Sequence, residues 1–195
     1  SFTVITGRVG AGKTTLLRTL LGLLPREAGE IRWNGRPVDD PASFFVPPRC
    51  AYTAQVPRLF NETLRQNILL GRRDDPAALA AAVRSAVLER DVEALENGLD
   101  TRIGAGGVRL SGGQVQRTAA ARMFARGAEL LVIDDLSSAL DVETESALWE
   151  RLMERRGTGG ERRNGGAGGP RTVLAVSHRR AALARADQII VLKDG

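Results

Sequence analysis

The sequence predicts a single α/β domain with a mostly parallel sheet, a small antiparallel hairpin region and an inserted α-helical subdomain. Strand-length apolar runs alternate with helix-like stretches, a pattern typical of strand–helix–strand units. Asn34-Gly35 separates two extended runs within 30–38, which is the strongest short signal for a hairpin. Between the strand-like segments, the composition turns rich in Ala and Leu over about 62–96. At 195 residues and 43% hydrophobic content, the chain can bury one sizeable core.

The predicted strands are short apolar runs that are bounded by Gly, Pro, Asn or Asp. They are expected at 2–6, 50–55, 129–135, 172–178 and 188–192. We expect the last two to be buried, because their residues are almost all apolar. Parallel strands of this kind place their sites at the carboxyl ends, so chemistry-bearing residues should follow the strands.

The predicted helices fill the spaces between these strands. They comprise a stretch from the glycine-rich segment 7–14 to near Pro25, the region 62–96 with a break at 71–76, a helix ending near Arg126, and a helix over 143–156. In the last of these, Leu148, Trp149 and Leu152 recur on one face. Seven glycines within 157–171 favour a flexible loop there. The helical subdomain is expected to span about 60–125.

Composition excludes several classes of protein. The formal net charge is +5, but the basic residues are nearly all Arg and are scattered, which favours a genome-wide composition bias over a face that binds nucleic acid or acidic lipid. A single cysteine, Cys50, excludes an internal disulfide and is expected to be a small buried hydrophobe in a reducing compartment. The sequence has no apolar run of about 18 residues and no signal peptide, so membrane contact would be peripheral or through a partner. Because Ser1 lies inside a strand-like run, we expect an excerpt of a longer polypeptide.

The segment "GRVGAGKT" at 7–14 matches G-x-x-x-x-G-K-[ST] between a predicted strand and a predicted helix. Glycines let the backbone curl, so that successive N–H groups and the helix N-terminus face one anion. Lys13 then reaches the β- and γ-phosphates of a nucleotide, and the Thr14 hydroxyl ligates Mg²⁺. The predicted cradle comprises Gly7, Arg8, Val9, Gly10, Ala11, Gly12, Lys13, Thr14 and Thr15. The alternative is a chance glycine turn before a helix, and the flanking elements argue against it. The fold class is therefore predicted to be a P-loop NTPase.

Two acids, Asp134 and Asp135, end the apolar run "LLVIDD". A P-loop site needs an acid at the end of a neighbouring buried strand to hold the Mg²⁺ shell, and Asp134 fits that role. Asp135 is expected to lie on the other side of the extended chain, where it can orient or deprotonate a water molecule. The alternative for such a pair is a strand terminus or a helix cap.

The string "LSGGQ" at 110–114 is a second glycine-bearing turn at a helix start, with Ser111 as a natural N-cap. Free N–H groups at such a turn can bind an anion. A plain Ser N-cap followed by flexible glycines is the simpler alternative for an isolated S-G-G.

These motifs together resemble the nucleotide-binding domain of ABC (ATP-binding cassette) ATPases over the whole chain. "GRVGAGKTT" is similar to the Walker A motif of that family, "LSGGQ" to its signature, "LLVID" to Walker B, and "SALD" at 138–141 to the D-loop. The resemblance implies catalytic roles for Asp135, His178 and Gln55, magnesium roles for Thr14, Gln55 and Asp134, and nucleotide contacts from Ser111, Gly112, Gly113, Gln114 and Asp141. His178, the only histidine, and Asp141 could by themselves be an ordinary capping or core residue and an ordinary N-cap.

The resemblance implies ATP and Mg²⁺ as cofactors, and a second such domain, identical or not, as a head-to-tail partner. Each ATP would lie between the Walker A of one domain and the signature of the other. The segment 59–71 is similar to exporter-type domains, which contact a transmembrane domain, fused or separate, at the cytoplasmic face of the cell membrane. No nucleic acid is expected as a partner. The aromatic residue that stacks on adenine in this family would precede Ser1.

Two departures from the family pattern keep alternatives open. Exporters usually carry an acid where Ala105 stands, and active members usually place Glu where Asp135 stands. The shorter acid would slow hydrolysis while ATP binding survives. One alternative is therefore a degenerate ATP-binding site in a heterodimeric transporter, and a further alternative is a soluble ABC ATPase of DNA repair or translation.

Overall fold

The computed structural model describes residues 1–136, 138–157 and 172–193. The core of the fold is a five-stranded sheet with the order β4-β5-β6-β1-β7, and every neighbouring pair is parallel. Its strands are β1 (Phe2–Gly7), β4 (Cys50–Thr53), β5 (Leu130–Asp134), β6 (Thr172–Val176) and β7 (Gln188–Leu192). The predicted α/β class with a mostly parallel sheet is confirmed.

The predicted hairpin forms a separate two-stranded antiparallel sheet of β2 (Arg32–Trp33) and β3 (Arg36–Pro37). Asn34 and Gly35 have φ angles of 49° and 78°, the left-handed values that a type I′ turn requires at both central positions. Local turn chemistry therefore determines this element.

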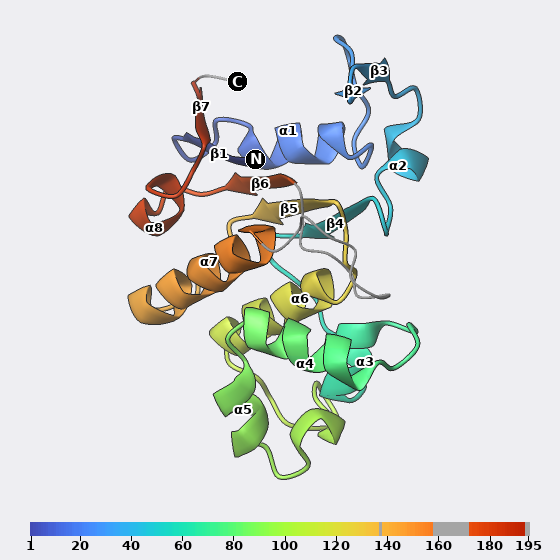
Figure 1. Cartoon of the computed structure of the whole chain (residues 1–195), viewed down its shortest axis with the longest axis vertical. Coiled ribbons are helices and arrows are strands. Elements are labelled where there is room, and N and C mark those ends of the chain that lie inside the picture. The colour runs from blue at the N-terminus through green and yellow to red at the C-terminus, as the bar shows by residue number, and fades with distance from the viewer. Residues whose placement is uncertain (137, 158–171, 194–195) are drawn as a thin grey trace.

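Helices cover both faces of the parallel sheet (Figure 1). On one face, α1 (Lys13–Leu20) contacts β1 and β5, while α6 (Gly112–Phe124) and α7 (Val142–Gly157) lie on the other. The short helix α8 (Arg180–Leu183) connects β6 to β7 and contacts α7. The sheet is thus the middle layer, between α1 on one face and α6 and α7 on the other.

Helix α1 ends before the predicted position near Pro25. Gly22 has a φ of 71°, and a Cβ at this residue would lie 2.3 Å from the backbone nitrogen of Ala42, at the start of α2 (Pro41–Phe44). The chain therefore turns sharply at a glycine that packs directly on the next helix.

The region predicted to be helical contains α3 (Leu64–Leu69), α4 (Pro76–Ser85), α5 (Glu89–Ala94) and the 3₁₀ turn η1 (Gly98–Asp100), and these lead to α6. Thr63 and Gln66 form a capping box at α3, and the side chain of Asp75 accepts hydrogen bonds from two N–H groups of α4. The predicted break at 71–76 is confirmed, because Leu70 and Gly71 both adopt positive φ.

The core lies mainly between the sheet and the helices below it in Figure 1. On α7, the predicted apolar face is confirmed, since Leu148, Trp149 and Leu152 are all buried. The Trp149 ring stacks on Phe2 of β1 with centroids 5.4 Å apart, which fixes α7 against the sheet. Cys50 is also buried, and burial raises the pKa of its thiol to about 12, so it behaves as an inert hydrophobe.

The prediction that the last strand is buried is wrong. In the described part of the chain β7 is an edge strand, and its residues Ile189 and Val191 are 48% and 69% exposed. Apolar composition does not distinguish an edge strand from a central one, because position in the sheet depends on pairing with distant residues. Of the expected loop at 157–171, Gly157 ends α7, and the rest lies outside the described residues. No helix among those described is long and apolar enough to span a bilayer.

The Trp149 packing predicts a large stability effect. Trp149→Ala removes a fully buried ring and should lower the free energy of unfolding by about 3–5 kcal/mol. Urea denaturation followed by circular dichroism measures this loss. Trp33→Ala is the matched control, because Trp33 is only half-buried beside the rings of Phe44 and Phe45. Equal losses in the two variants would contradict this account of the core.

Candidate nucleotide-binding site

The register of the sheet brings the predicted site residues to one edge. Val176 of β6 lies opposite Ile5 of β1 on one side and opposite Asp134 of β5 on the other. A cavity of about 300 Å³ opens there. Its lining residues are Val9, Gly10, Gly12, Lys13, Thr14, Thr15, Gln55, Asp134, Asp135, Val176 and His178. The structure thus brings together the glycine-rich loop, both acids, Gln55 and His178, and it adds Val176, which the sequence analysis did not single out.

The glycine-rich loop requires glycine at specific positions. Gly7 has a φ of 141°, and a Cβ there would lie 2.2 Å from the carbonyl oxygen of Leu192 in the neighbouring strand. Gly10 and Gly12 have φ angles of 84° and 83°. Gly12 precedes α1 and has no side chain to cap it, so the first N–H groups of the helix remain available to an anion.

Lys13 crosses the loop that it follows. Its Nζ donates hydrogen bonds to the carbonyl oxygens of Gly7, at 2.8 Å, and Arg8, at 2.7 Å. An ammonium group has three donor hydrogens, so it can still contact a phosphate oxygen in the cradle.

Asp134 is a fully buried carboxylate at the end of β5. The Thr14 hydroxyl donates to its Oδ1 at 3.0 Å, and the Tyr52 hydroxyl donates to its Oδ2 at 3.3 Å. Burial raises the pKa of the Asp134 carboxyl, while these two hydrogen bonds and the charge of Arg18 oppose that rise.

Sequence reasoning missed Tyr52. It pairs with Val132, two positions before Asp134 on the neighbouring strand, so the two side chains share a face of the sheet. The available signal was the lone polar ring in the short strand before Gln55, but its partner depends on the pairing of β4 with β5.

The expectation that Asp135 lies on the opposite side of an extended chain is wrong. The strand ends at Asp134, and Asp135 turns with a φ of 50°, a left-handed conformation that Asp tolerates better than most residues. Its N–H donates to the Val176 carbonyl oxygen at 3.1 Å, and both acids line the same cavity. Gln55 Nε2 donates to Asp135 Oδ2 at 3.4 Å. Asp135 Oδ1 is buried and has no hydrogen-bond partner within the described residues.

These residues fit a nucleotide with Mg²⁺. A hydroxyl and a carboxylate at hydrogen-bond distance supply the oxygen ligands that Mg²⁺ prefers. Residues 1–136, 138–157 and 172–193 contain no cluster of three or more His, Cys, Asp or Glu that could hold a metal. A cation here would therefore rely on Thr14, Asp134, phosphate oxygens and water, as Mg²⁺ commonly does, and the magnesium role of Gln55 remains a prediction.

The signature turn lies apart from this cavity. Ser111 caps α6 and forms a capping box with Gln114, so the predicted N-cap is confirmed. Gln114 Nε2 also donates to Asp91 of α5 at 3.0 Å. Among the described residues that line the cavity, none comes from 111–114. The nucleotide contacts of Ser111, Gly112, Gly113 and Gln114 therefore remain predictions about a second molecule.

Asp141 caps α7. Its Oδ1 accepts a hydrogen bond from the Thr144 N–H and its Oδ2 accepts one from the Thr144 hydroxyl, each at 2.8 Å, and these bonds lower the pKa of the carboxyl. Its predicted contact with a nucleotide remains a prediction.

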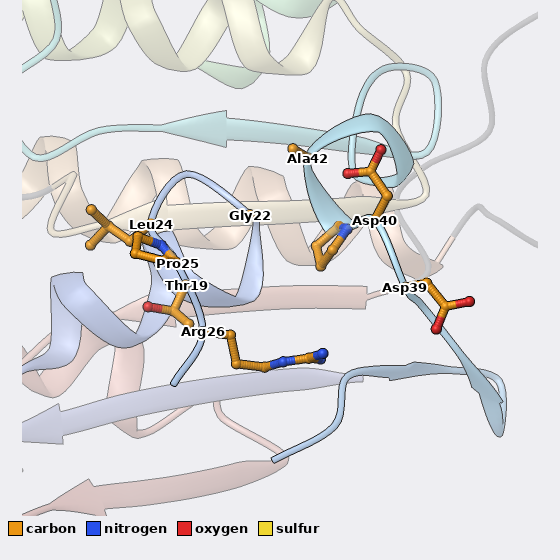
Figure 2. A pocket seen from close by; sticks show the side chains of 9 residues that line it. Thr19, Gly22, Leu24, Pro25, Arg26, Asp39, Asp40 and Ala42 are labelled. Atoms are coloured by element: carbon orange, nitrogen blue, oxygen red, sulfur yellow. The ribbon is translucent and has the colours of Figure 1, made fainter. Parts of the chain in front are cut away.

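A second cavity, of about 290 Å³, lies where the loop after α1 meets the start of α2 (Figure 2). Its polar lining residues include Thr19, Arg26, Asp39 and Asp40, and Asp40 caps α2. None of the predicted site residues lines it.

A glycine cradle between a parallel strand and a helix, with Lys13 and Thr14 at its end and a buried acid on a neighbouring strand, defines a P-loop nucleotide-binding domain. The chain belongs to the ABC transporter family, whose model matches residues 1–138. The predicted family is thereby confirmed, and membership implies that the domain binds ATP.

Curated relatives match nearly the whole chain. The chain is 38% identical over 194 residues to an ATP-dependent lipid A-core flippase of Burkholderia orbicola, a match that covers 98% of this chain and 30% of the relative. It is 34% identical over 192 residues to a probable multidrug resistance ABC transporter ATP-binding/permease protein, YheI, of Bacillus subtilis, covering 98% and 31%. The chain thus spans about a third of the length of these relatives.

Among solved structures, the fold matches a bacterial Atm1-family ABC exporter with ATP bound. The TM-score is 0.84 at 31% identity, and the match covers 100% of this chain and 32% of that one. The predicted fold class, with its parallel sheet and small antiparallel pair, is confirmed by this match.

The raised pKa of Asp134 predicts that removing its charge stabilises the nucleotide-free domain at neutral pH. Stability that this carboxyl contributes is fully present below its ordinary pKa of 3.8 and is lost as the pH rises through the raised pKa of the folded state. Asp134→Asn should therefore make the nucleotide-free domain more stable at pH 7 and remove this part of its pH dependence. The variant should also lose the extra stabilisation that Mg²⁺ adds in the presence of ATP. Urea denaturation across pH, with and without Mg-ATP, measures both effects. If the nucleotide-free variant is less stable than the wild type at pH 7, the raised pKa of Asp134 is contradicted.

Proposed function

We propose that this domain binds ATP with Mg²⁺ and hydrolyses it to power transport by an ABC exporter. The observation that carries the proposal is the single cavity in which the glycine cradle, the Thr14–Asp134 pair, Asp135 and His178 meet. The printed names of the relatives, a flippase and an ATP-binding/permease protein, support the exporter role, as does the likeness to a solved exporter with ATP bound.

Binding uses the loop and the helix that follows it. The N–H groups of the loop and of the first turn of α1 donate to phosphate oxygens, and Lys13 contributes a positive charge. Thr14 and Asp134 would hold Mg²⁺, which would supply positive charge to neutralise the phosphates. The hydrogen bond between these two side chains already fixes their oxygens near each other before the ligand arrives.

Hydrolysis needs a water molecule in line with the γ-phosphate. Asp135 is the proposed base, because it lines the cavity and its Oδ2, whose bond from Gln55 is long at 3.4 Å, can also accept a hydrogen bond from that water. His178 follows buried β6 and is exposed at the cavity, where it can contact the γ-phosphate. Gln55 and His178 follow β4 and β6, the two strands that lie on either side of β5.

Asp135 is one methylene shorter than glutamate, which withdraws its carboxylate by roughly 1.5 Å. A base must come within about 2.6 to 3.2 Å of its water or act through a second one. We therefore expect slow hydrolysis at this domain's own site and intact ATP binding.

A second domain would complete the site. The turn at Ser111 and Gly112 is exposed, so it is free to meet a nucleotide held by a partner's cradle. Val9, at the tip of the cradle, is fully exposed and would lie against that partner. The partner is a second copy or a related domain, arranged head to tail.

The rest of the exporter is proposed to include a transmembrane part, with this domain at the cytoplasmic face of the membrane. A permease and an ATP-binding protein share one name in the Bacillus subtilis relative, which supports a fused arrangement. The comparisons do not favour the alternative of a soluble ABC ATPase of DNA repair or translation.

The test of the proposal is steady-state Mg-ATP hydrolysis by the native polypeptide with its membrane partner. Asp135→Ala should abolish turnover if the short acid is the working base, and Asp135→Asn separates loss of charge from loss of volume. Asp135→Glu should then raise turnover severalfold, because the longer side chain reaches the water directly. ATP binding is measured for each variant, since Glu adopts the left-handed backbone of this position less readily than Asp.

If Ala leaves turnover nearly unchanged and Glu raises it, the site mainly binds ATP, and a partner domain with a glutamate performs the hydrolysis. Absence of ATP binding by the wild type would contradict the proposed function itself.

A further inference from the structure

We propose that Gln116 is a positioning residue that locks the segment 138–141 onto the signature turn and so couples that turn to the candidate base Asp135. This inference rests on the proposed function. It concerns a residue outside the cavity, and Gln116 acts through the segment it holds.

Both polar atoms of the Gln116 side chain bind the same short segment. Gln116 is 5% exposed on α6, and its Nε2 donates to Ser138 Oγ at 2.7 Å. Its Oε1 accepts from the Ala139 N–H at 3.1 Å. A buried amide with both ends satisfied by one loop specifies the position of that loop, because displacement would leave buried polar groups unpaired.

The glycines of the signature turn, Gly112 and Gly113, pack against the same segment. A Cβ on Gly113 would lie 3.0 Å from the Ala139 carbonyl oxygen, and a Cβ on Gly112 would lie 3.5 Å from the Ala139 side chain. Leu140 is also buried. Segment 138–141 therefore packs directly on the first turn of α6, most closely at Gly113, where a Cβ would require the neighbouring backbone to shift by a few tenths of an ångström.

Segment 138–141 lies between the candidate base Asp135 and the start of α7. It begins three residues after Asp135 and ends at Asp141, which caps α7 through Thr144. A shift of the signature turn, as expected when it meets a partner's nucleotide, is thus transmitted through Gln116 and Ala139 toward Asp135. The same contacts transmit a change at Asp135 in the opposite direction.

Thr118 provides a matched control. It lies two residues further along α6, is fully buried, and its hydroxyl donates to the Gln114 carbonyl oxygen at 2.7 Å within the helix. Thr118→Val removes one buried hydrogen bond from the same helix without touching the contacts of Gln116. Gln116→Met preserves volume and removes both bonds to the segment.

The experiment compares wild type, Gln116→Met, Ser138→Ala, the double variant and Thr118→Val in the native polypeptide with its membrane partner. Measured quantities are kcat and KM for Mg-ATP, the melting temperature, and amide hydrogen exchange in a peptide covering 138–141. Gln116→Met should lower kcat by about threefold to tenfold, the loss expected when one or two neutral hydrogen bonds no longer support the transition state. KM should stay within about twofold, and exchange in 138–141 should become faster.

The double variant should lose less than the product of the two single losses, because both single variants break the Gln116–Ser138 contact. Thr118→Val should leave kcat and the exchange of 138–141 near wild type. Wild-type kcat in Gln116→Met overturns the inference. A kcat loss that Thr118→Val reproduces, in step with melting temperature, also overturns it, because the effect is then general destabilisation. A wild type that binds no ATP refutes the proposed function first, and the inference falls with it.

Discussion

The site depends on the register of strand β6. Because Val176 lies opposite both Ile5 and Asp134, the ends of β1, β5 and β6 coincide at one sheet edge. The glycine-rich loop, the buried Asp134 and His178 come from three separate segments of the chain and therefore meet at the same cavity. A shift of one residue in either pairing would move Asp134 to the opposite face and away from Thr14. The hydrogen bond between Thr14 and Asp134 links segments 120 residues apart and is a direct consequence of that register.

At this edge the chain departs from local preferences. A carboxylate is fully buried at Asp134, a non-glycine residue has positive φ at Asp135, and a buried carboxylate oxygen there lacks a partner in the described structure. Each departure opposes folding, since buried charge and left-handed backbone are unfavourable. Such departures concentrate where a ligand completes the interactions. Bound Mg²⁺ and ATP would supply the missing charge and hydrogen bonds, so ligand binding and stability are coupled in this domain.

The helical region is attached to the sheet layer through α7 as well as through α6. The Arg151 guanidinium donates to Glu89 of α5 at 2.8 Å, and Arg155 donates to Ser85 of α4 at the same distance. Gln116 adds a third connection from α6 to the segment before α7. The signature turn is therefore connected to the segment that lies between Asp135 and α7, although it does not line the cavity. In the proposed dimer, this arrangement lets one domain respond to nucleotides on two of its surfaces.

Several elements of this protein were predictable from the sequence alone, because they depend on the conformational preferences of neighbouring residues. The cradle glycines, the Asn34-Gly35 turn and the Ser111 cap depend on conformations that nearby residues fix, so the sequence predicted them correctly. The exposure of β7, the turn at Asp135 and the contact of Tyr52 with Asp134 were not predicted. Each depends on which distant strand lies alongside, and a single sequence does not record that pairing. The chemical types of the site residues were thus readable from the sequence, while their mutual orientation required the tertiary structure.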